Sequence, residues 1–525
     1  MFATACSDGK FLTHRSVPKI DDWFVPNPTS QFLTVPVFLK FIETPFADQT
    51  LIVIHMASRL LLSNAFKART GVAKKFIRPL ATATNLFPAT RTTTLANGLT
   101  VATEENPTAQ TATVGVWIDA GSRAENEKNN GAAHFLEHMA FKGTNTRTQR
   151  DLELQIENMG AHLNAYTSRE QTVYYAKAFK SDVPQAVEIL SDILQNSKLE
   201  YQAIERERDV ILREQEEVDK QLEEVVFDHL HATAFQGQSL GRTILGPKEN
   251  IQSLTRDDLA NYIKTNYSGD RMVLVGAGSV DHDHLVSLAE KNFGNLPCET
   301  SQSVGSKVMT GKPKFTGSEI RMRDDTMPQA HIAMAVEGVS WTSPDYFPIL
   351  VLQSIIGSWD RTLGATGHMS SRLSAVVNKH QLANSFMSFN TSYKDTGLWG
   401  IYLISENKTQ LDDLIYFTQK EWARLATTVT EGEVERSKMQ LKASLLLGLD
   451  GSTAIAEDIG RQMLTSSKRM SPHEVEVAVS GITVDDVRRV AKEYLSDKEV
   501  AIVGLGPIEA LPDYNRVRGF MSDNK

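Results

Sequence analysis

The chain has 525 residues, of which 41% are hydrophobic and 23% are charged. This length predicts more than one domain, and the composition is typical of globular proteins. Two cysteines, Cys6 and Cys298, are too few for a disulfide framework, and no apolar run is long enough to cross a membrane.

The N-terminal part differs from the rest of the chain in charge. Residues 1–90 hold 10 Lys and Arg against 5 Asp and Glu, whereas the remainder holds 45 against 59. A strongly acidic main part is expected to repel nucleic acid and to attract cationic peptides. The sequence therefore argues against a nucleic-acid partner.

Six of the ten basic residues of this N-terminal part lie between Met56 and Arg91. No Asp or Glu occurs between Gln49 and Thr103, and Ser, Thr, Ala and Leu surround the basic residues there. This composition predicts a mitochondrial presequence at 56–90, with a disordered basic arm as the alternative. Residues 1–55 contain five acidic residues and are expected to be a leader that the mature protein lacks.

The segment H-F-L-E-H at 134–138 has the pattern H-x-x-E-H, the reverse of a zinc-protease motif. On an α-helix, His134 and His138 lie on one face and can bind one metal ion. Glu137 is then close enough to accept a proton from a metal-bound water. The pattern predicts a zinc hydrolase, with a chance match as the alternative.

The helix that carries this motif has expected ends. Gly131 precedes its first residues, and Lys142 and Gly143 follow the apolar residues after the motif. A cation in the last turn with a glycine beyond it is typical of a helix C-terminus. We therefore expect this helix to extend to about Lys142.

Residues 161–167, A-H-L-N-A-Y-T, alternate as in a β-strand. If this strand lies at the edge of a sheet, an extended peptide could pair with it by strand addition. An interior strand is the alternative, and the pattern does not distinguish the two.

Residues 205–218 predict a helix with five glutamates. One stripe at helical spacing is apolar and comprises Val210, Ile211, Val218 and Val225. Glu207 and Glu214 fall on this stripe, and a core-facing carboxylate needs a charged partner or a metal ion. The other glutamates lie off the stripe or at its border: Glu205, Glu216 and Glu217. A salt-bridged surface helix is the alternative.

Further along, Glu224 and Asp228 are four residues apart and share a helix face. Together they could hold one guanidinium group through charge-assisted hydrogen bonds. Without further information, a solvated surface is the more ordinary interpretation of such a pair.

The chain contains an internal repeat. The segments S-L-T-R-D-D-L at 253–259 and V-L-V-G-A-G at 273–278 recur as G-I-T-V-D-D-V at 481–487 and A-I-V-G-L-G at 501–506. Both pairs are offset by 228 residues, which predicts two domains of one fold. The residues from 301 to 316, rich in Gly and Pro, are expected to link them.

The second copy lacks the candidate metal ligands. The offset places Lys442 opposite Glu214, and the helix expected near 347–357 contains neither His nor Glu. We therefore expect a catalytic zinc domain at 91–300 and an inactive homologous domain at 317–525.

Four strings carry a family resemblance. They are H-F-L-E-H-M-A-F-K-G-T (134–144), L-N-A-Y-T-S-R-E (163–170), E-R-E-R-D-V-I-L-R-E (205–214) and G-R-T-I-L-G (241–246). From about Arg91 to its C-terminus the chain resembles the pitrilysin-type (inverzincin) metallopeptidases, most closely the beta-type subunits of mitochondrial processing peptidases. The resemblance implies an α+β fold in which each domain is a mainly antiparallel sheet packed with helices.

The resemblance also implies roles for individual residues. Glu214 would be the third zinc ligand beside His134 and His138, and Glu207 would orient a ligand. The residues that would contact the substrate are Phe141 beside the scissile bond, Asn164 and Ala165 along an edge strand, and Glu224 and Asp228 on an arginine before the cleavage site.

The resemblance further implies the reaction and the partners. The expected function is cleavage of presequences from imported precursors in the mitochondrial matrix, with Zn²⁺, in a heterodimer with an alpha subunit. The stretch 364–367 is too poor in glycine for the glycine-rich loop of an alpha subunit. A core scaffold subunit of respiratory complex III, with or without peptidase activity, is the alternative.

Overall fold

The computed structural model describes residues 88–298, 311–363 and 371–522. The expected leader, nearly all of the presequence, most of the linker and the stretch 364–367 lie outside these residues. The part of the linker that is described, 311–316, contains neither helix nor strand.

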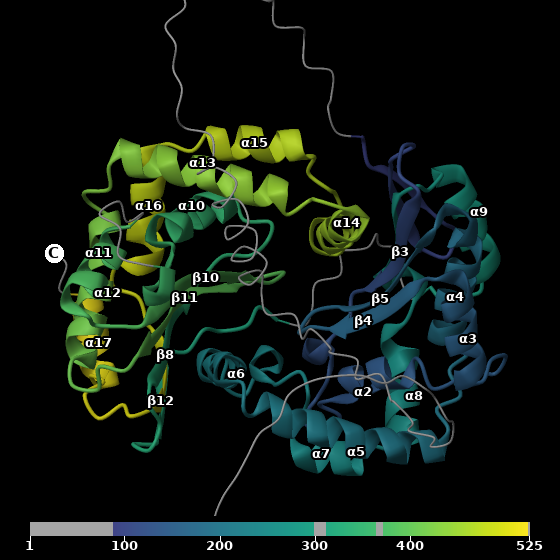
Figure 1. The fold of residues 1–525 in the computed structure, drawn as a ribbon, viewed down its shortest axis with the longest axis horizontal. Coiled ribbons are helices and arrows are strands. Elements are labelled where there is room, and N and C mark those ends of the chain that lie inside the picture. Colours follow the sequence, from purple (N-terminus) through teal and green to yellow (C-terminus); the bar gives the residue numbers. More distant parts are fainter. Residues whose placement is uncertain (1–87, 299–310, 364–370, 523–525) are drawn as a thin grey trace, which may run out of the picture. The chain divides into compact units, whose positions relative to one another are not determined.

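The described residues form two halves of similar composition in helices and strands (Figure 1). The first contains β1 (Arg91–Thr94), β2 (Thr100–Glu105), β3 (Thr111–Ile118), α2 (Ala132–Met139), α3 (Gln149–Met159), β4 (His162–Thr167), β5 (Thr172–Phe179), α4 (Val183–Gln195), α5 (Tyr201–Val218), α6 (Leu222–Ala234), α7 (Lys248–Ser253), α8 (Arg256–Asn266), β6 (Met272–Gly278) and α9 (His282–Phe293). The second contains β7 (Ser318–Arg323), β8 (Ala330–Glu337), α10 (Tyr346–Ile356), β9 (Ser358–Asp360), α11 (Arg372–His380), β10 (Ser385–Ser392), β11 (Gly397–Ser405), α12 (Leu411–Leu425), α13 (Glu431–Leu447), α14 (Ser452–Ser466), α15 (Pro472–Ser480), α16 (Val484–Leu495), β12 (Ala501–Gly506) and α17 (Tyr514–Ser522). Short 3₁₀ helices are η1 (Ser122–Ala124), η2 (Lys180–Asp182), η3 (Ser239–Gly241), η4 (Gly269–Arg271) and η5 (Arg361–Leu363).

Each half has a six-stranded sheet, and five strands of each sheet follow the same order, β2-β6-β3-β5-β4 in the first and β7-β12-β8-β11-β10 in the second. The strand orders are β1-β2-β6-β3-β5-β4 and β7-β12-β8-β11-β10-β9. The pairs β2–β6 and β7–β12 are parallel, and the other pairs are antiparallel. The expected α+β class, with two homologous, mainly antiparallel sheets packed with helices, is confirmed.

The repeated sequence blocks form equivalent elements. Thr255 caps α8 and Thr483 caps α16, each through a capping box with the Asp three residues later. Such a cap satisfies N–H groups that a helix N-terminus leaves without partners. The strands that follow, β6 and β12, occupy matching positions in their sheets. The offset of 228 residues therefore relates equivalent elements of the structure as well as similar segments of the sequence.

One helix of each half packs on the sheet of the other half. Helix α14 packs on β2, β3 and β6, and α6 packs on β7, β8 and β12. In Figure 1, α14 lies on the side of the first sheet opposite α4 and α9. A Cβ at Gly460 of α14 would overlap the ring of Trp117 on β3, so glycine is required for this close approach. Each of these two helices thus builds an apolar cluster on a sheet of the other half.

A buried charge network joins the two halves. The Arg123 guanidinium donates to Glu170 at 2.5 Å and to both oxygens of Asp395 at 2.9 and 2.6 Å. The backbone N–H of Lys394 donates to Glu170, and its ammonium group pairs with Asp119. These contacts fix the turn between β4 and β5 against the turn between β10 and β11.

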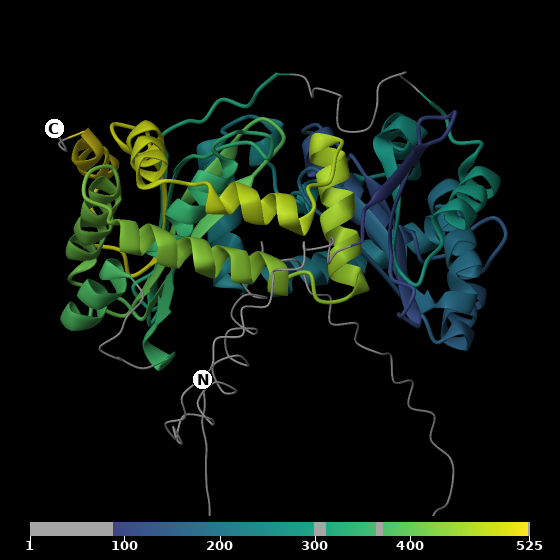
Figure 2. The same cartoon turned by 90° about the horizontal axis from the view of Figure 1, so that it is seen from above.

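Helices α13 and α15 of the second half lie side by side, as both views show (Figures 1 and 2). Helix α10 packs on α13, as α2 packs on α5 in the first half. Among the described residues, no helix has the length and apolar character that a bilayer crossing requires.

The packing of α6 gives a stability prediction. Phe227 is 7% exposed and makes edge-to-face contact with Phe389 at 4.9 Å between ring centroids. Phe227→Ala should lower the free energy of unfolding by about 3–5 kcal/mol, because it leaves a cavity in this core. The measurement is urea-induced unfolding, with Phe179→Ala as the matched control, since Phe179 is 54% exposed. Equal effects of the two substitutions would contradict the packing role.

Candidate metal centre

The H-x-x-E-H segment lies on α2, and this helix is almost completely buried. It ends at Met139, before the expected end at Lys142, so that prediction is wrong by one turn. The Lys142 ammonium group lies 2.8 Å from Glu207 Oε1 on α5. Beyond the helix, Gly143 adopts a φ of +110°, in the left-handed region that favours glycine. Lys142 is therefore a partner of the site and not a helix cap.

Three candidate ligand atoms come together from two helices. Glu214 Oε2 on α5 lies 3.0 Å from His138 Nε2 and 3.8 Å from His134 Nε2. The ligand atoms of these residues all lie within 4.8 Å of one another. In the part of the chain that the structure describes, this is the group of His, Cys, Asp and Glu side chains that could hold a metal ion.

The donor set fits a divalent metal ion that accepts nitrogen. Two imidazole nitrogens and one carboxylate oxygen are the ligands of a catalytic site that keeps a further position open for water. Magnesium and calcium prefer sites made of oxygen atoms alone. The chemistry of the residues therefore agrees with the metal that the sequence predicts.

Glu207 supports one of these ligands. Its Oε2 lies 3.3 Å from His138 Nδ1, and its Oε1 binds Lys142. Burial alone would raise the pKa of Glu207, but the hydrogen bonds from His138 and Lys142 outweigh it and lower the pKa. The ionised carboxylate can hold a proton on Nδ1, which leaves Nε2 as the ligand atom.

The face of α5 toward the site agrees with the expected stripe only in part. Glu207 and Ile211 are buried and Glu214 is half-buried, whereas Glu216 and Glu217 are exposed. Val225 does not continue the stripe, because α5 ends at Val218 and Val225 belongs to α6. That part of the prediction is wrong, since a turn separates the two helices.

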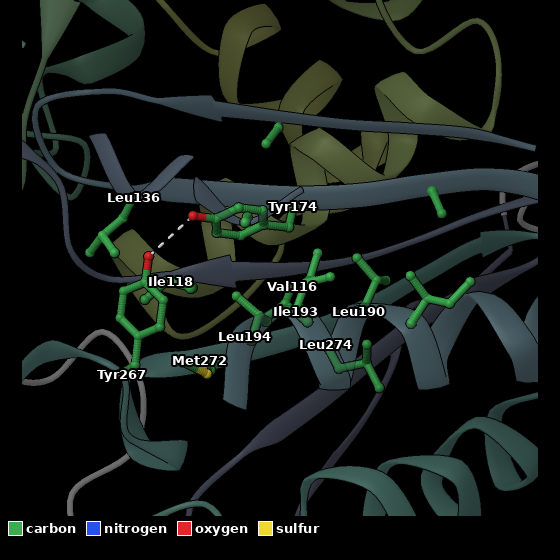
Figure 3. Close-up of a cluster of buried hydrophobic side chains, with 14 of the residues drawn as sticks. Val116, Ile118, Leu136, Tyr174, Leu190, Ile193, Leu194, Tyr267, Met272 and Leu274 are labelled. Atoms are coloured by element: carbon green, nitrogen blue, oxygen red, sulfur yellow. Dashed lines mark hydrogen bonds between the residues drawn. The ribbon is translucent and has the colours of Figure 1, made fainter. Parts of the chain in front are cut away.

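Glu137 lies on the same buried helix, and its carboxylate acts on the pKa of both Tyr174 and Tyr267. The hydroxyl groups of these two tyrosines point toward one another (Figure 3). The hydroxyl groups of Tyr174 and Tyr267 are 3.3 Å apart. Burial, and after it the partner Tyr267 and the Glu137 carboxylate, raise the pKa of Tyr174 well above its usual value. Both phenols therefore stay protonated near Glu137 at neutral pH.

Strand β4 lies at the edge of the first sheet, which was one of the two alternatives. Asn164 is exposed there, and Ala165 is buried. Phe141 is half-buried and contacts Tyr174 edge to face at 6.5 Å. The edge position is consistent with strand addition by a peptide, but the substrate roles of these residues stay predictions.

Glu224 and Asp228 both lie on α6, and Asp228 has an internal partner that the sequence did not suggest. The Arg169 guanidinium donates to Asp228 Oδ1 at 2.6 Å. Burial acts against the charge of Arg169, but Asp228 and, more weakly, Glu224 raise its pKa. The carboxylate pair thus already faces one arginine of the same chain.

Two of the residues at the site were missed by sequence reasoning. Lys142 was interpreted only as a helix-terminal cation, and Arg169 was only part of a matching string. In both cases the partner is distant in the sequence, Glu207 for Lys142 and Asp228 for Arg169. The unpaired core-facing carboxylate at 207 was the one available signal that a nearby cation was needed.

The equivalent place in the second half holds no such cluster among the described residues. Helix α10 has the sequence Y-F-P-I-L-V-L-Q-S-I-I, and Lys442 on α13 donates to Ser480 Oγ at 3.2 Å. The second copy therefore has the helix pair without the ligands.

Comparisons with known proteins agree with this architecture. The family model "Insulinase (Peptidase family M16)" matches residues 100–248, and "Peptidase M16 inactive domain" matches residues 253–441. A solved structure titled "Complex III2 from Candida albicans, Inz-5 bound" contains a chain that is 31% identical, with a TM-score of 0.73. The match covers 82% of this chain and 99% of that chain.

Several curated relatives are much more similar. The mitochondrial-processing peptidase subunit beta of Lentinula edodes is 65% identical over 88% of this chain and 98% of the relative. That of Neurospora crassa is 61% identical over 89% and 100%, and that of Bos taurus is 57% identical over 82% and 87%. The chain therefore belongs to peptidase family M16, a metallopeptidase family, and within it to the mitochondrial-processing peptidase beta subunits.

Proposed function

We propose that this chain is a zinc metalloendopeptidase subunit that cleaves presequences from precursor proteins imported into the mitochondrial matrix. The observation that carries the proposal is the cluster of His134, His138 and Glu214 beside Glu137 on a buried helix. The name of the relatives, mitochondrial-processing peptidase, supports a processing role in mitochondria.

His134, His138 and Glu214 would hold the zinc ion. When bound, zinc supplies a Lewis acid that polarises the scissile carbonyl and lowers the pKa of a bound water. Glu137 accepts the proton of the attacking water and passes it to the leaving amine. Glu207 holds the His138 ring in one orientation through Nδ1.

The substrate would bind as an extended strand. Its backbone would pair with β4 beside Asn164 and Ala165, because an edge strand has hydrogen-bonding groups without strand partners on one side. Phe141 would contact the residue that follows the scissile bond. Presequences are cationic, and the main part of this chain is acidic, so long-range attraction favours their association.

An arginine before the cleavage site would bind Glu224 and Asp228. Since Arg169 uses Oδ1 of Asp228, the substrate guanidinium would share this carboxylate with an internal one. Two carboxylates facing one fixed arginine leave a net charge of about −1, which matches one substrate arginine. Arg169 thereby also limits the repulsion between the two acids.

The partner would be an alpha subunit, as the designation "subunit beta" of the relatives suggests. A second candidate function is that of a core scaffold subunit of respiratory complex III. The observation that favours it is the similarity to a chain of the Candida albicans complex. A scaffold does not need an ionisable ligand cluster on a buried face, so about one zinc per purified chain would support the peptidase.

Glu137→Gln should retain zinc and lose peptidase activity. The amide preserves the shape of the side chain but cannot accept a proton, and loss of a general base lowers kcat by about 10²–10⁴-fold. The measurements are metal content and cleavage of a presequence peptide by the assembled heterodimer. Glu216→Gln, at an exposed position of α5, is the control, and near-full activity of the Glu137 variant would exclude Glu137 as the base.

Glu214→Gln should weaken zinc binding, whereas Lys442→Gln should not. The loss of zinc affinity should exceed the roughly 10–100-fold loss that follows removal of a residue that only orients a ligand. Zinc affinity is measured by competition with a chromophoric chelator. Unchanged affinity in the Glu214 variant would require a different third ligand, with Glu207 the next candidate.

Glu224→Gln combined with Asp228→Asn should impair cleavage of substrates that have an arginine near the scissile bond. Each hydrogen bond between charged partners contributes about 1.5–3 kcal/mol, so kcat/KM should fall at least about tenfold. The comparison uses a presequence peptide and its Arg→Ala form, with zinc content as a control. Glu224→Gln alone, which leaves the Arg169–Asp228 pair intact, should give a smaller effect of the same kind. If wild type and variants discriminate equally between the two peptides, the arginine site lies elsewhere.

A further inference from the structure

A buried carboxylate lies before the helix that carries the candidate metal ligands. Glu125 is 5% exposed and does not belong to any of the groups assigned above. Its Oε1 accepts from Ala133 N at 2.7 Å, and its Oε2 accepts from Gly131 N at 2.9 Å and from Asn130 Nδ2 at 2.7 Å. Two of these donors are backbone N–H groups at the start of α2.

Helix α2 has no cap of its own. The N-cap position is held by Gly131 in the left-handed region at φ +103°, and no side-chain cap comes from this position. The helix has only eight residues, and three of them are His134, Glu137 and His138. A short helix depends on its end contacts, since few internal hydrogen bonds hold it. Glu125 supplies the acceptor and the negative charge that an N-cap residue normally provides.

The loop G-R-T-I-L-G at 241–246 holds the Glu125 segment from the other side. Arg242 donates to the backbone oxygen of Glu125 at 2.5 Å, and Asn130 donates to the backbone oxygen of Thr243 at 2.9 Å. The same loop accepts, at Gly246 O, from the side chain of Gln215 at 3.2 Å. Gln215 is adjacent to Glu214 on α5. The loop therefore connects the start of α2 to the part of α5 that carries the third ligand.

We propose that Glu125 is a positioning residue that fixes the ligands on α2 relative to Glu214, and so sets the affinity of the site for its metal ion. The proposal rests on the proposed function in one respect, the zinc site itself. A helix start that is free to fray would let His134 sample other positions, although Glu214 remains in place. The cost of ordering the ligands would then be added to metal binding, which lowers the affinity.

The test is Glu125→Gln in the full chain, assembled as the heterodimer. An amide has one acceptor oxygen and one donating NH₂ group. Its NH₂ group must therefore face at least one of the N–H groups from which the carboxylate now accepts a hydrogen bond. At pH 8 the wild-type carboxylate is charged, since burial raises the pKa of Glu125 to about 7. The zinc dissociation constant should rise roughly 10–100-fold, the range found when partners that orient ligands are removed.

Glu127→Gln is the matched control, because Glu127 is an exposed glutamate of the same loop. It should leave the zinc affinity unchanged. A second measurement, hydrogen exchange of residues 131–140 in the metal-free proteins, should show faster exchange in the Glu125 variant than in wild type or the control. Zinc affinity and exchange that both equal those of wild type would overturn the proposal, as would a lower melting temperature with unchanged zinc affinity.

If Glu125→Gln does not fold, Asn130→Ala carries the same test, because it removes the hydrogen bond to the carboxylate, together with the one to Thr243 O, and leaves Glu125 in place. A several-fold weaker affinity would support the proposal, and an unchanged one would overturn it. The failure of the proposed function looks different: wild-type protein would then not bind zinc. Hydrogen exchange in the metal-free proteins would still report whether Glu125 holds the helix.

Discussion

The packing of α2 against α5 is the contact on which the candidate centre depends. Two ligands come from one helix and the third comes from the other, so a small shift between the helices would separate them. The contact contains three carboxylates, Glu137, Glu207 and Glu214, whose burial is costly unless cations are near. Lys142 compensates part of this charge, and the His138 ring lies 3.3 Å from Glu207 and 3.0 Å from Glu214. A divalent ion at the site would compensate the rest, so metal binding and helix packing stabilise each other.

The exchange of helices between the halves explains why a second domain without ligands matters for the first. Helix α6 carries Glu224 and Asp228, yet its apolar face packs on the second sheet. His231 on the same helix is hydrogen-bonded through Nε2 to the hydroxyl of Tyr393, in the turn between β10 and β11. The position of the carboxylate pair is therefore set by the second half, while the candidate metal ligands are set by the first. The proposed cleavage near an arginine would require both groups to be held at a fixed separation.

The sequence predicted the local parts of this structure well. Helical spacing brings His134 and His138 together, and the 228-residue offset predicted two related sheets, because both signals are present in the chain itself. The end of α2 was not predicted, since Lys142 serves Glu207 and does not cap the helix. The apolar stripe through Val225 failed because a three-residue turn interrupts the helix. The partners Arg169 and Asp228 are 59 residues apart, and no local pattern reports such a contact.

The comparison of the two copies separates what the fold requires from what the chemistry requires. Helix α2 packs on α5 and α10 packs on α13, and five strands follow the same order in the two sheets. In the second pair, the position of the His-bearing helix is filled by buried aliphatic residues such as Ile349 and Leu352. The fold is therefore stable with an apolar helix at this place and does not need imidazoles or carboxylates there. The buried charges of the first copy add a desolvation cost that packing alone does not repay. Their presence in one copy only agrees with the metal ion that we propose for His134, His138 and Glu214, whose ligand atoms lie within 4.8 Å of one another.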